Sequence, residues 1–156
     1  MTPIRRARPD KRDAILAIWL RSVRATHAFL SEDDIAFFEP LVRDGLASDE
    51  LDVWVLCRDT DAPIGFLGLS GKRIEALFLD PDHRRQGGGR RLVDHARRLS
   101  AELSLDVNEE NPEARRFYEA CGFVVEGRSE VDGTGRPFPL LHMRLAHPAD
   151  PSPGRP

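Results

Sequence analysis

Residues 77–90 read LFLDPDHRRQGGGR, in which an apolar strand-like run is followed by a turn and three consecutive glycines. Beyond the glycines, apolar residues recur at helical spacing. A glycine-rich turn between a strand and a helix lets the backbone approach a ligand closely, and the free N–H groups of the first helical turn favour an anion. The stretch therefore predicts a phosphate-binding loop, with a merely flexible turn as the alternative.

Two well-known nucleotide-binding motifs do not match this loop. A Walker A loop requires Gly-Lys-Ser/Thr, and no such sequence follows the glycines. The dinucleotide-binding fingerprint fails as well, because its three-glycine spacing is absent and the loop lies in mid-chain. Both classes of nucleotide-binding protein are therefore excluded.

A second distinctive stretch, residues 111–123, reads NPEARRFYEACGF. Asn111 is a good helix cap, Pro112 is tolerated at the first helical position, and Glu113 favours the positive end of the helix dipole. The stretch predicts a helix that ends at Gly122.

Together the two stretches resemble the acetyl-CoA-binding motifs of the GCN5-related N-acetyltransferase (GNAT) superfamily. Residues 77–81, followed by Arg84, Gly87 and Gly89, are similar to the family's loop motif. Residues 111–123 are similar to its pattern of Asn, Ala, Phe-Tyr and Gly-Phe. Two motifs in the family's order are more specific than either alone, and the likeness extends over roughly residues 3–145.

Within the superfamily, the chain resembles the bacterial YjaB-type acetyltransferases. The similar segments are residues 21–30, 107–111 and 127–132. Gly88 departs from the superfamily pattern, since many members have a branched apolar residue there. We expect this glycine to make the loop more flexible without removing its N–H donors.

The order of secondary-structure signals agrees with this resemblance. Apolar runs predict strands over residues 4–7, 51–57, 64–69, 73–79, 103–107, 123–127 and 140–145. Helical spacing predicts helices over residues 11–28 and 31–45, after the glycine-rich loop, and over 111–122. Asp10 and Ser31 are the predicted caps of the first two helices, and Gly45 is the predicted end of the second.

The resemblance implies an α+β GNAT fold. Its mixed, mostly antiparallel sheet of six or seven strands would be flanked by helices, with a single-residue bulge in the strand over residues 73–79. We expect one domain, residues 1–146, followed by a disordered proline-rich tail, residues 147–156.

Composition restricts the class of protein further. The chain has 156 residues, of which 40% are hydrophobic and 31% charged, as expected for a soluble globular protein. It has no run of ~20 apolar residues and no secretory signal, which predicts a cytoplasmic location without membrane attachment. The net charge of −3 gives no global attraction to nucleic acid. Two cysteines in apolar surroundings indicate neither a disulfide nor a metal site.

The resemblance assigns cofactor-binding roles to a set of residues around the loop. The strand segment would pair with the pantetheine arm of acetyl-CoA, the glycine loop would hold the pyrophosphate, and arginines would meet the phosphates. For each arginine, a solvated helix face is the alternative, and for the asparagine it is helix capping alone. The residues are Leu77, Phe78, Leu79, Arg84, Arg85, Gln86, Gly87, Gly88, Gly89, Arg90 and Asn111.

Acetylation of an amine needs a proton acceptor and a proton donor, because the amine is mostly protonated at neutral pH and the leaving thiolate needs a proton. Tyr118 matches the family's tyrosine acid, with core packing as the alternative. Strand alternation places Glu75 on the face of Leu77 and Leu79 if no bulge intervenes, which makes it one candidate base.

Three further residues are candidates for handling the amine proton. His27 has a suitable unperturbed pKa and lies in a region that resembles the family's acceptor-binding helices. Asn108 resembles a YjaB-type asparagine that orients water, in which case no dedicated base is needed. His142 is a lesser candidate. An ordinary surface or core residue is the alternative for both histidines.

The sequence therefore predicts an acyl-CoA-dependent N-acetyltransferase that acts on a primary amine in a direct ternary complex, with no metal. The acceptor could be a protein lysine, an N-terminal amine, a polyamine or an antibiotic amine, and the YjaB-type likeness favours lysine. Because GNAT enzymes are often dimers, a homodimer is one arrangement open to the chain. The alternatives are a non-catalytic acyl-CoA-binding module and a nucleic-acid-binding module built on the six arginines between Arg84 and Arg98, which the net charge disfavours.

Overall fold

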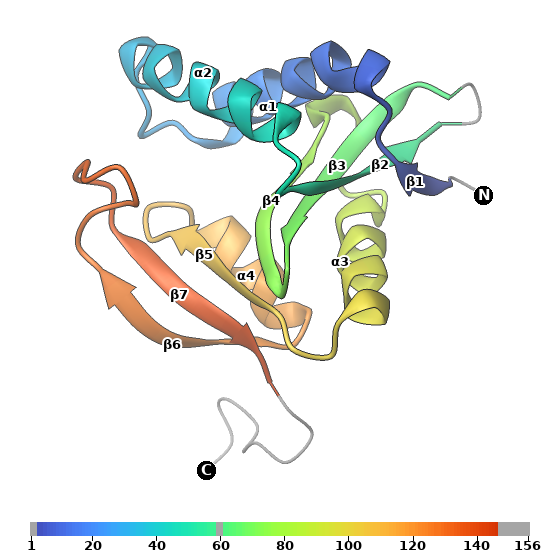
Figure 1. Ribbon diagram of the computed structural model, residues 1–156. Coiled ribbons are helices and arrows are strands. Elements are labelled where there is room, and N and C mark those ends of the chain that lie inside the picture. Colours follow the sequence, from blue (N-terminus) through green and yellow to red (C-terminus); the bar gives the residue numbers. More distant parts are fainter. Residues whose placement is uncertain (1–2, 59–60, 147–156) are drawn as a thin grey trace. The chain divides into compact units, whose positions relative to one another are not determined.

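The computed structural model describes residues 3–58 and 61–146, and the chain divides into two compact units, Met1–Leu99 and Ser100–Pro156 (Figure 1). Its strands and helices follow the predicted order, with two short 3-10 helices added at Pro9–Lys11 and Pro81–His83. The tail that we predicted to be disordered, residues 147–156, lies outside the described residues.

The first unit is an antiparallel sheet with helices on both faces. The strands are β1 (Ile4–Arg6), β2 (Asp52–Cys57), β3 (Pro63–Ser70) and β4 (Arg73–Leu79), and they are neighbours in that order. The helices are α1 (Arg12–Thr26), α2 (Glu32–Ala47) and α3 (Gly88–Leu99). Figure 1 shows α1 and α2 on one face of these strands and α3 on the other.

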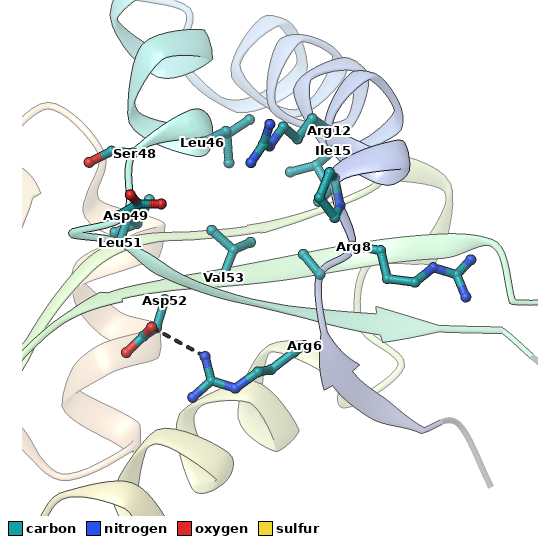
Figure 2. A pocket seen from close by; sticks show the side chains of 12 residues that line it. Arg6, Arg8, Arg12, Ile15, Leu46, Ser48, Asp49, Leu51, Asp52 and Val53 are labelled. Atoms are coloured by element: carbon teal, nitrogen blue, oxygen red, sulfur yellow. Dashed lines mark hydrogen bonds and ion pairs between the residues drawn. The ribbon is translucent and has the colours of Figure 1, made fainter.

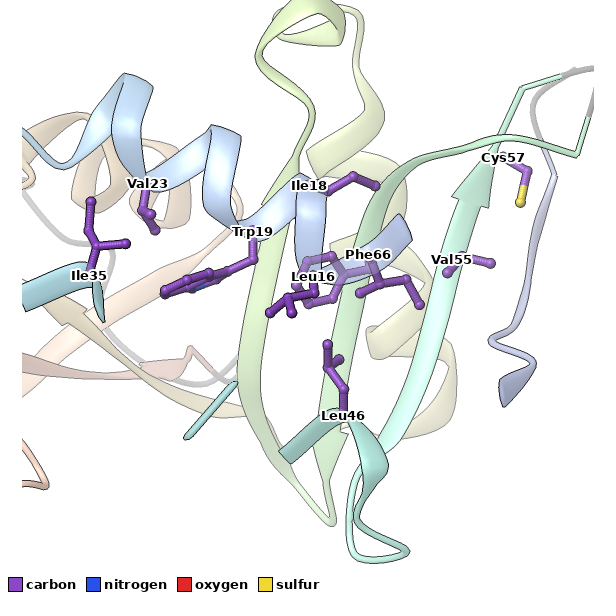
Figure 3. Close-up of a cluster of buried hydrophobic side chains, with 10 residues drawn as sticks. Leu16, Ile18, Trp19, Val23, Ile35, Leu46, Val55, Cys57 and Phe66 are labelled. Carbon is purple, nitrogen blue, oxygen red and sulfur yellow. The ribbon is translucent and has the colours of Figure 1, made fainter. Parts of the chain in front are cut away.

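The core between α1, α2 and the strands follows from the apolar spacing of α1. Ile15, Ile18 and Trp19 lie on one helical face and are at most 5% exposed. They belong to one cluster with Phe66 of β3 and Val55 of β2 (Figure 3). Burial of each such side chain is worth about 1.5–3 kcal/mol, so this cluster anchors α1 to the sheet.

The residues predicted to begin and end the first two helices needed two corrections. Asp10 does not cap α1: it lies in a 3-10 turn, ion-pairs with Arg8 at 3.2 Å, and leaves the helix to begin at Arg12. Ser31 is confirmed as the cap of α2, because its Oγ accepts a hydrogen bond from the Asp34 N–H at 3.0 Å. Gly45 does not end α2, which continues to Ala47 because Leu46 in its last turn is buried.

A bulge interrupts β4, as the family resemblance implied. Gly68 of β3 pairs with Ala76 and Leu69 pairs with Ile74, so Glu75 is the extra residue. An extra residue in one strand shifts the inward and outward alternation by one position. Two residues an even number of positions apart therefore lie on opposite faces of the sheet when the bulge separates them.

The second unit is a smaller antiparallel sheet with one helix. Its strands β5 (Ser104–Asn108), β7 (Leu140–Leu145) and β6 (Phe123–Ser129) are neighbours in that order. Helix α4 (Pro112–Ala120) packs on the face that carries Phe123 and Met143, since the ring of Tyr118 on α4 contacts the ring of Phe123. Alternation in β5 and β7 places a set of half-buried polar residues on the opposite face: Ser104, Asp106, Asn108, His142 and Arg144.

Candidate functional site

The glycine-rich loop has the backbone that an anion site needs. Arg85 and Gly87 both have positive φ values, 63° and 82°, and α3 begins directly afterwards at Gly88. The Arg91 N–H donates to the Gly87 carbonyl at 3.1 Å, so the N–H groups just before it have no helical acceptor. Gly88 and Gly89 are buried, whereas Arg85, Gln86, Gly87 and Arg90 are exposed, so the outer part of the loop lies at the surface at the positive end of the helix.

Gly88 has a packing role that the expectation of a more flexible loop missed. It is buried, and a Cβ at this position would lie 2.8 Å from Leu56 Cδ2 and 3.2 Å from Leu79 Cδ2. A side chain here would force these core leucines apart. The glycine therefore lets the start of α3 lie directly against the sheet, which fixes the position of the loop.

An ion pair that the sequence did not predict holds the start of the loop. Asp80 is only 13% exposed, accepts a hydrogen bond from the Asp82 N–H at 3.1 Å, and accepts another from Arg21 of α1. Burial acts to raise the pKa of Asp80, but the hydrogen bonds from Asp82 and Arg21 outweigh it and the pKa is lowered. Asp80 thus ties the loop to α1 as a carboxylate.

The end of β4 places alternate side chains on opposite faces. Leu79 faces α3 through its contact with Gly88, and alternation places Leu77 on the same face. The Phe78 ring faces α1, where it stacks on Phe66 at 5.6 Å between ring centroids. Pairing of the backbone of residues 77–79 with pantetheine stays a prediction.

Our geometric argument for Glu75 is wrong because of the bulge. The shift in alternation moves Glu75 away from the Leu77 and Leu79 face, to the side of Phe78. There its carboxylate ion-pairs with Arg73 at 3.1 Å, and the side chain is 41% exposed. To act as a base, the Glu75 carboxylate would have to leave its ion pair with Arg73.

His27 follows the last residue of α1 and is half-buried among aromatic rings. Its ring centroid lies 5.3 Å from that of Phe29 and 6.3 Å from that of Phe78, and the Thr26 Oγ1 lies 2.7 Å from its Nδ1. Burial lowers the pKa of His27 from 6.5 to about 4. The ring is therefore neutral at physiological pH and a weak base.

Tyr118 lies in the core of the second unit. Its ring makes edge-to-face contacts with Phe117 and Phe123, at 5.1 and 5.7 Å between centroids. Burial, with a smaller effect of Cys121, raises the pKa of Tyr118 above its usual value of 10. The phenol therefore keeps its proton at any physiological pH, which an acid that protonates a thiolate requires.

Two asparagines flank the turn that joins β5 to α4. Asn111 is confirmed as a helix cap, because its Oδ1 accepts a hydrogen bond from the Ala114 N–H at 3.2 Å. Asn108 ends β5 on the sheet face opposite α4, and its carbonyl accepts the Asn111 N–H at 3.0 Å. A contact of Asn111 with the cofactor and a water-orienting role for Asn108 stay predictions.

The second unit also contains a hydrogen-bonded chain of three side chains that sequence reasoning missed. Asp106 Oδ1 lies 2.6 Å from His142 Nδ1, and His142 Nε2 lies 2.6 Å from Ser129 Oγ. The sequence singled out only His142, and only as a lesser candidate base. The three residues come from three strands, so no local motif could have indicated the chain.

The first unit has a cavity of about 230 Å³ near β1 and the end of α2 (Figure 2). Its rim is mixed in charge, with Arg6 paired to Asp52 at 3.2 Å and Asp49 nearby. None of the predicted site residues lines it. The cavity is thus separate from the candidate loop.

Residues 3–58 and 61–146 contain no group of three or more His, Cys, Asp or Glu side chains arranged to hold a metal ion. No helix within these ranges is long and apolar enough to cross a membrane.

Known proteins resemble the chain over nearly its full length. It is 49% identical to the peptidyl-lysine N-acetyltransferase YjaB of Salmonella typhimurium, over 92% of this chain and 97% of the relative. It is 32% identical to the peptidyl-lysine N-acetyltransferase YiaC of Escherichia coli, over 86% of this chain and 91% of the relative. A family model for the acetyltransferase (GNAT) domain matches residues 49–125.

Solved structures agree with these relatives. The solution structure of apo YjaB from Escherichia coli has a TM-score of 0.86 and 47% identity, and the match covers 93% of this chain and 97% of that one. The PaiA N-acetyltransferase of Thermoplasma acidophilum, solved in complex with coenzyme A, shares the fold with a TM-score of 0.77 at 19% identity, over 94% and 99% of the two chains. The predicted fold class and the YjaB-type resemblance are confirmed. The chain therefore belongs to the GNAT family of N-acetyltransferases.

Proposed function

We propose that this protein transfers the acetyl group of acetyl-CoA to the side-chain amine of lysine in a protein substrate. The observation that carries the proposal is the match at 49% identity, over at least 90% of both chains, to two relatives that are named peptidyl-lysine N-acetyltransferase. YiaC, at 32% identity, has the same name. Agreement among these relatives favours lysine over the polyamine and antibiotic acceptors that the sequence left open.

The loop geometry supports acetyl-CoA as the donor. The loop residues before α3 are exposed, and the exposed Arg85 and Arg90 add positive charge beside the start of the helix. The dipole and N–H groups of a helix N-terminus, together with nearby guanidinium groups, suit the phosphates of coenzyme A. We assign the pyrophosphate to this loop and the pantetheine arm to the backbone of residues 77–79.

The chemistry that we propose is direct attack of the amine on the thioester. Holding both substrates in one complex supplies most of the acceleration through orientation. Tyr118 keeps its proton because burial raises the pKa of the phenol, and from its match to the family's tyrosine acid we assign it the protonation of the leaving thiolate. No covalent acyl-enzyme is needed, and both cysteines are buried.

A single acceptor assay tests the proposal. Purified protein is incubated with acetyl-CoA and a peptide whose N-terminus is blocked and whose only amine is one lysine. Mass spectrometry should show one added acetyl group on lysine, and release of free coenzyme A should match it in amount.

The same assay with other acceptors separates the alternatives. Spermidine and a lysine-free peptide with a free N-terminus serve as competing acceptors. Faster turnover of either one would contradict a lysine acetyltransferase. Binding of acetyl-CoA without turnover of any amine would instead indicate the non-catalytic binding module.

Two further parts of the proposal concern the protein in the cell. We expect a homodimer from the family resemblance and a cytoplasmic location from the composition of the sequence. Sedimentation at several protein concentrations and cell fractionation test them.

A further inference from the structure

The three-residue chain in the second unit lies on the sheet face opposite α4. Asp106 of β5 and His142 of β7 are directly opposed in the strand register, and His142 is opposed on its other side by Gly127 of β6. Ser129, two residues further along β6, reaches back to the imidazole. Asp106 and His142 are half-buried, with 20% and 35% of their side chains exposed, so the chain is ordered but open to solvent.

The His142 ring packs directly against the neighbouring strand. A Cβ on Gly127 would lie 3.4 Å from His142 Cδ2, which is ordinary van der Waals contact. A bulge between Val125 and Gly127 shifts the register of β6. That shift fixes which side chains of β6 reach the His142 face, and Ser129 is one of them.

The hydrogen-bond partners indicate which ring nitrogen carries the proton. An ionised carboxylate only accepts hydrogen bonds, so Asp106 requires a proton on His142 Nδ1. His142 Nε2 is then the acceptor, and the Ser129 hydroxyl donates to it. This order, from carboxylate to imidazole to hydroxyl, is the one in which a histidine draws a proton from a serine hydroxyl.

Other residues that we considered as bases are less suited to the task. Glu75 is occupied by its ion pair with Arg73. His27 has a pKa of about 4, so it has little affinity for the proton of an amine. Only His142 among these residues has a carboxylate placed to stabilise its imidazolium form.

We propose that Ser129, His142 and Asp106 form the proton-accepting relay of the acetyl transfer. Ser129 is the catalytic residue, because its hydroxyl contacts the acceptor amine, whereas His142 and Asp106 act through it. The inference rests on the proposed function, and it names the face of β5, β6 and β7 opposite α4 as the side on which the acceptor lies.

The bound lysine ammonium gives one proton to Ser129 Oγ while the hydroxyl proton passes to His142 Nε2, and Asp106 stabilises the resulting imidazolium. The neutral amine nitrogen then forms a bond to the thioester carbonyl carbon as the carbon–sulfur bond breaks. The nitrogen loses a second proton and the coenzyme A thiolate gains one, so the products are the acetylated amine, the free thiol and one proton, which the imidazolium releases to solvent.

Within residues 100–146, the charged groups on the His142 face are few. Asp106 lies on β5, and Arg144 lies two residues from His142 on β7. Glu126 of β6 ion-pairs with Arg144 at 3.3 Å, which balances that charge. Asp106 is therefore the charged group in direct contact with the imidazole.

Kinetics of three variants as a function of pH test the relay. Ser129→Ala, His142→Gln and Asp106→Asn are compared with the wild type on the lysine peptide between pH 7 and pH 9.5. We expect kcat to fall by about 100-fold at pH 7 for His142→Gln, with little change in KM. The loss should shrink as pH rises toward the lysine pKa of ~10.4, since more of the acceptor then needs no proton acceptor.

Two controls separate catalysis from folding. Ser104→Ala lies on the same face of β5 as Asp106 and should keep wild-type kinetics. In His142→Ala, added imidazole should restore part of the activity, because the side chain is 35% exposed and its removal leaves a ring-sized space that solvent can reach. A variant that is merely misfolded would respond neither to pH nor to imidazole.

The outcomes distinguish the relay from the function on which it rests. If the wild type acetylates lysine and His142→Gln matches it at every pH, the relay is overturned and the acetyltransferase stands. A loss in His142→Gln that is the same at every pH and is not rescued by imidazole also overturns the relay. If the folded wild type acetylates no amine, both proposals fall.

Discussion

Gly88 and Gly45 both lie in helices, but a side chain at each would meet different surroundings. Nothing lies within 4 Å of a Cβ at Gly45, whereas a Cβ at Gly88 would lie 2.8 Å from Leu56 Cδ2. Glycine spacing in the sequence identified the loop but could not reveal this difference. The residues that a side chain would meet come from β2 and β4, outside the glycine-rich loop.

Gly88→Ala should therefore destabilise the protein by about 1–3 kcal/mol through overpacking. Gly45→Ala is the matched control and should be neutral or stabilising by up to about 1 kcal/mol, because alanine is the better helix former. Urea unfolding of both variants measures the difference. Equal stabilities of the two variants would contradict the packing role of Gly88.

Tyr118→Phe should separate chemistry from stability. Phenylalanine keeps the ring contacts with Phe117 and Phe123, so removal of the hydroxyl should change the free energy of unfolding by less than about 1 kcal/mol. Loss of the proton donor should lower kcat by about 100-fold and leave acetyl-CoA binding intact. Unchanged kcat with a normal unfolding curve would show that Tyr118 serves only as core packing.

At the scale of elements, the predictions held where the signal is local. Ser31 and Asn111 were identified as caps because their partners lie three residues away. Aspartate is as common a helix cap as serine and asparagine. Asp10 nevertheless pairs with Arg8 in a 3-10 turn and does not cap α1. Local propensity does not distinguish these two outcomes.

Pairing between strands was harder to predict. The family resemblance implied the bulge in β4 but not its position at Glu75, so the face of Glu75 was assigned wrongly. The chain of Asp106, Ser129 and His142 depends on the register of three strands and on a second bulge, in β6. The residues along one strand indicate neither the position of the β4 bulge nor the pairing of β5, β6 and β7.

Asn111 allows the two roles suggested for it to be measured separately. Asn111→Ala should lose about 1 kcal/mol of stability through loss of the cap, whereas Asn111→Asp should keep the cap. If the side chain also contacts the cofactor, Asn111→Asp should weaken acetyl-CoA binding at wild-type stability. Calorimetric titration and urea unfolding of both variants give the answer, and full affinity in both would restrict Asn111 to capping.

For the whole molecule, His27 makes stability depend on pH. Its pKa is about 4 in the folded state, against 6.5 for a solvent-exposed histidine, so the unfolded state binds the proton more readily. Stability is therefore fully present above pH 6.5 and falls as pH drops through the window from 6.5 to 4. Between pH 7.5 and pH 4.5 this one group should lower the free energy of unfolding by roughly 2–3 kcal/mol.

His27→Gln removes this titration, so its stability should fall less steeply than that of the wild type over the same window. Urea unfolding at pH 7.5, 6 and 4.5 measures both slopes. Parallel slopes for the two proteins would mean that His27 is not buried as a neutral ring.

We propose that residues 84–90 form the acetyl-CoA-binding loop, and one variant tests that proposal directly. Gly87 is exposed, has a φ of 82°, and has nothing within 4 Å of a Cβ. Gly87→Glu places a negative charge among the N–H groups proposed to hold the pyrophosphate. Gly87→Asn is the matched control, since asparagine tolerates positive φ and adds no charge.

Calorimetric titration with acetyl-CoA is the most direct measurement. The wild type and Gly87→Asn should bind acetyl-CoA with similar affinity, and Gly87→Glu should bind at least ~100-fold more weakly, through loss of anion contacts and repulsion of the phosphates. Failure of the folded wild type to bind acetyl-CoA, or equal binding by Gly87→Glu and Gly87→Asn, would contradict the account.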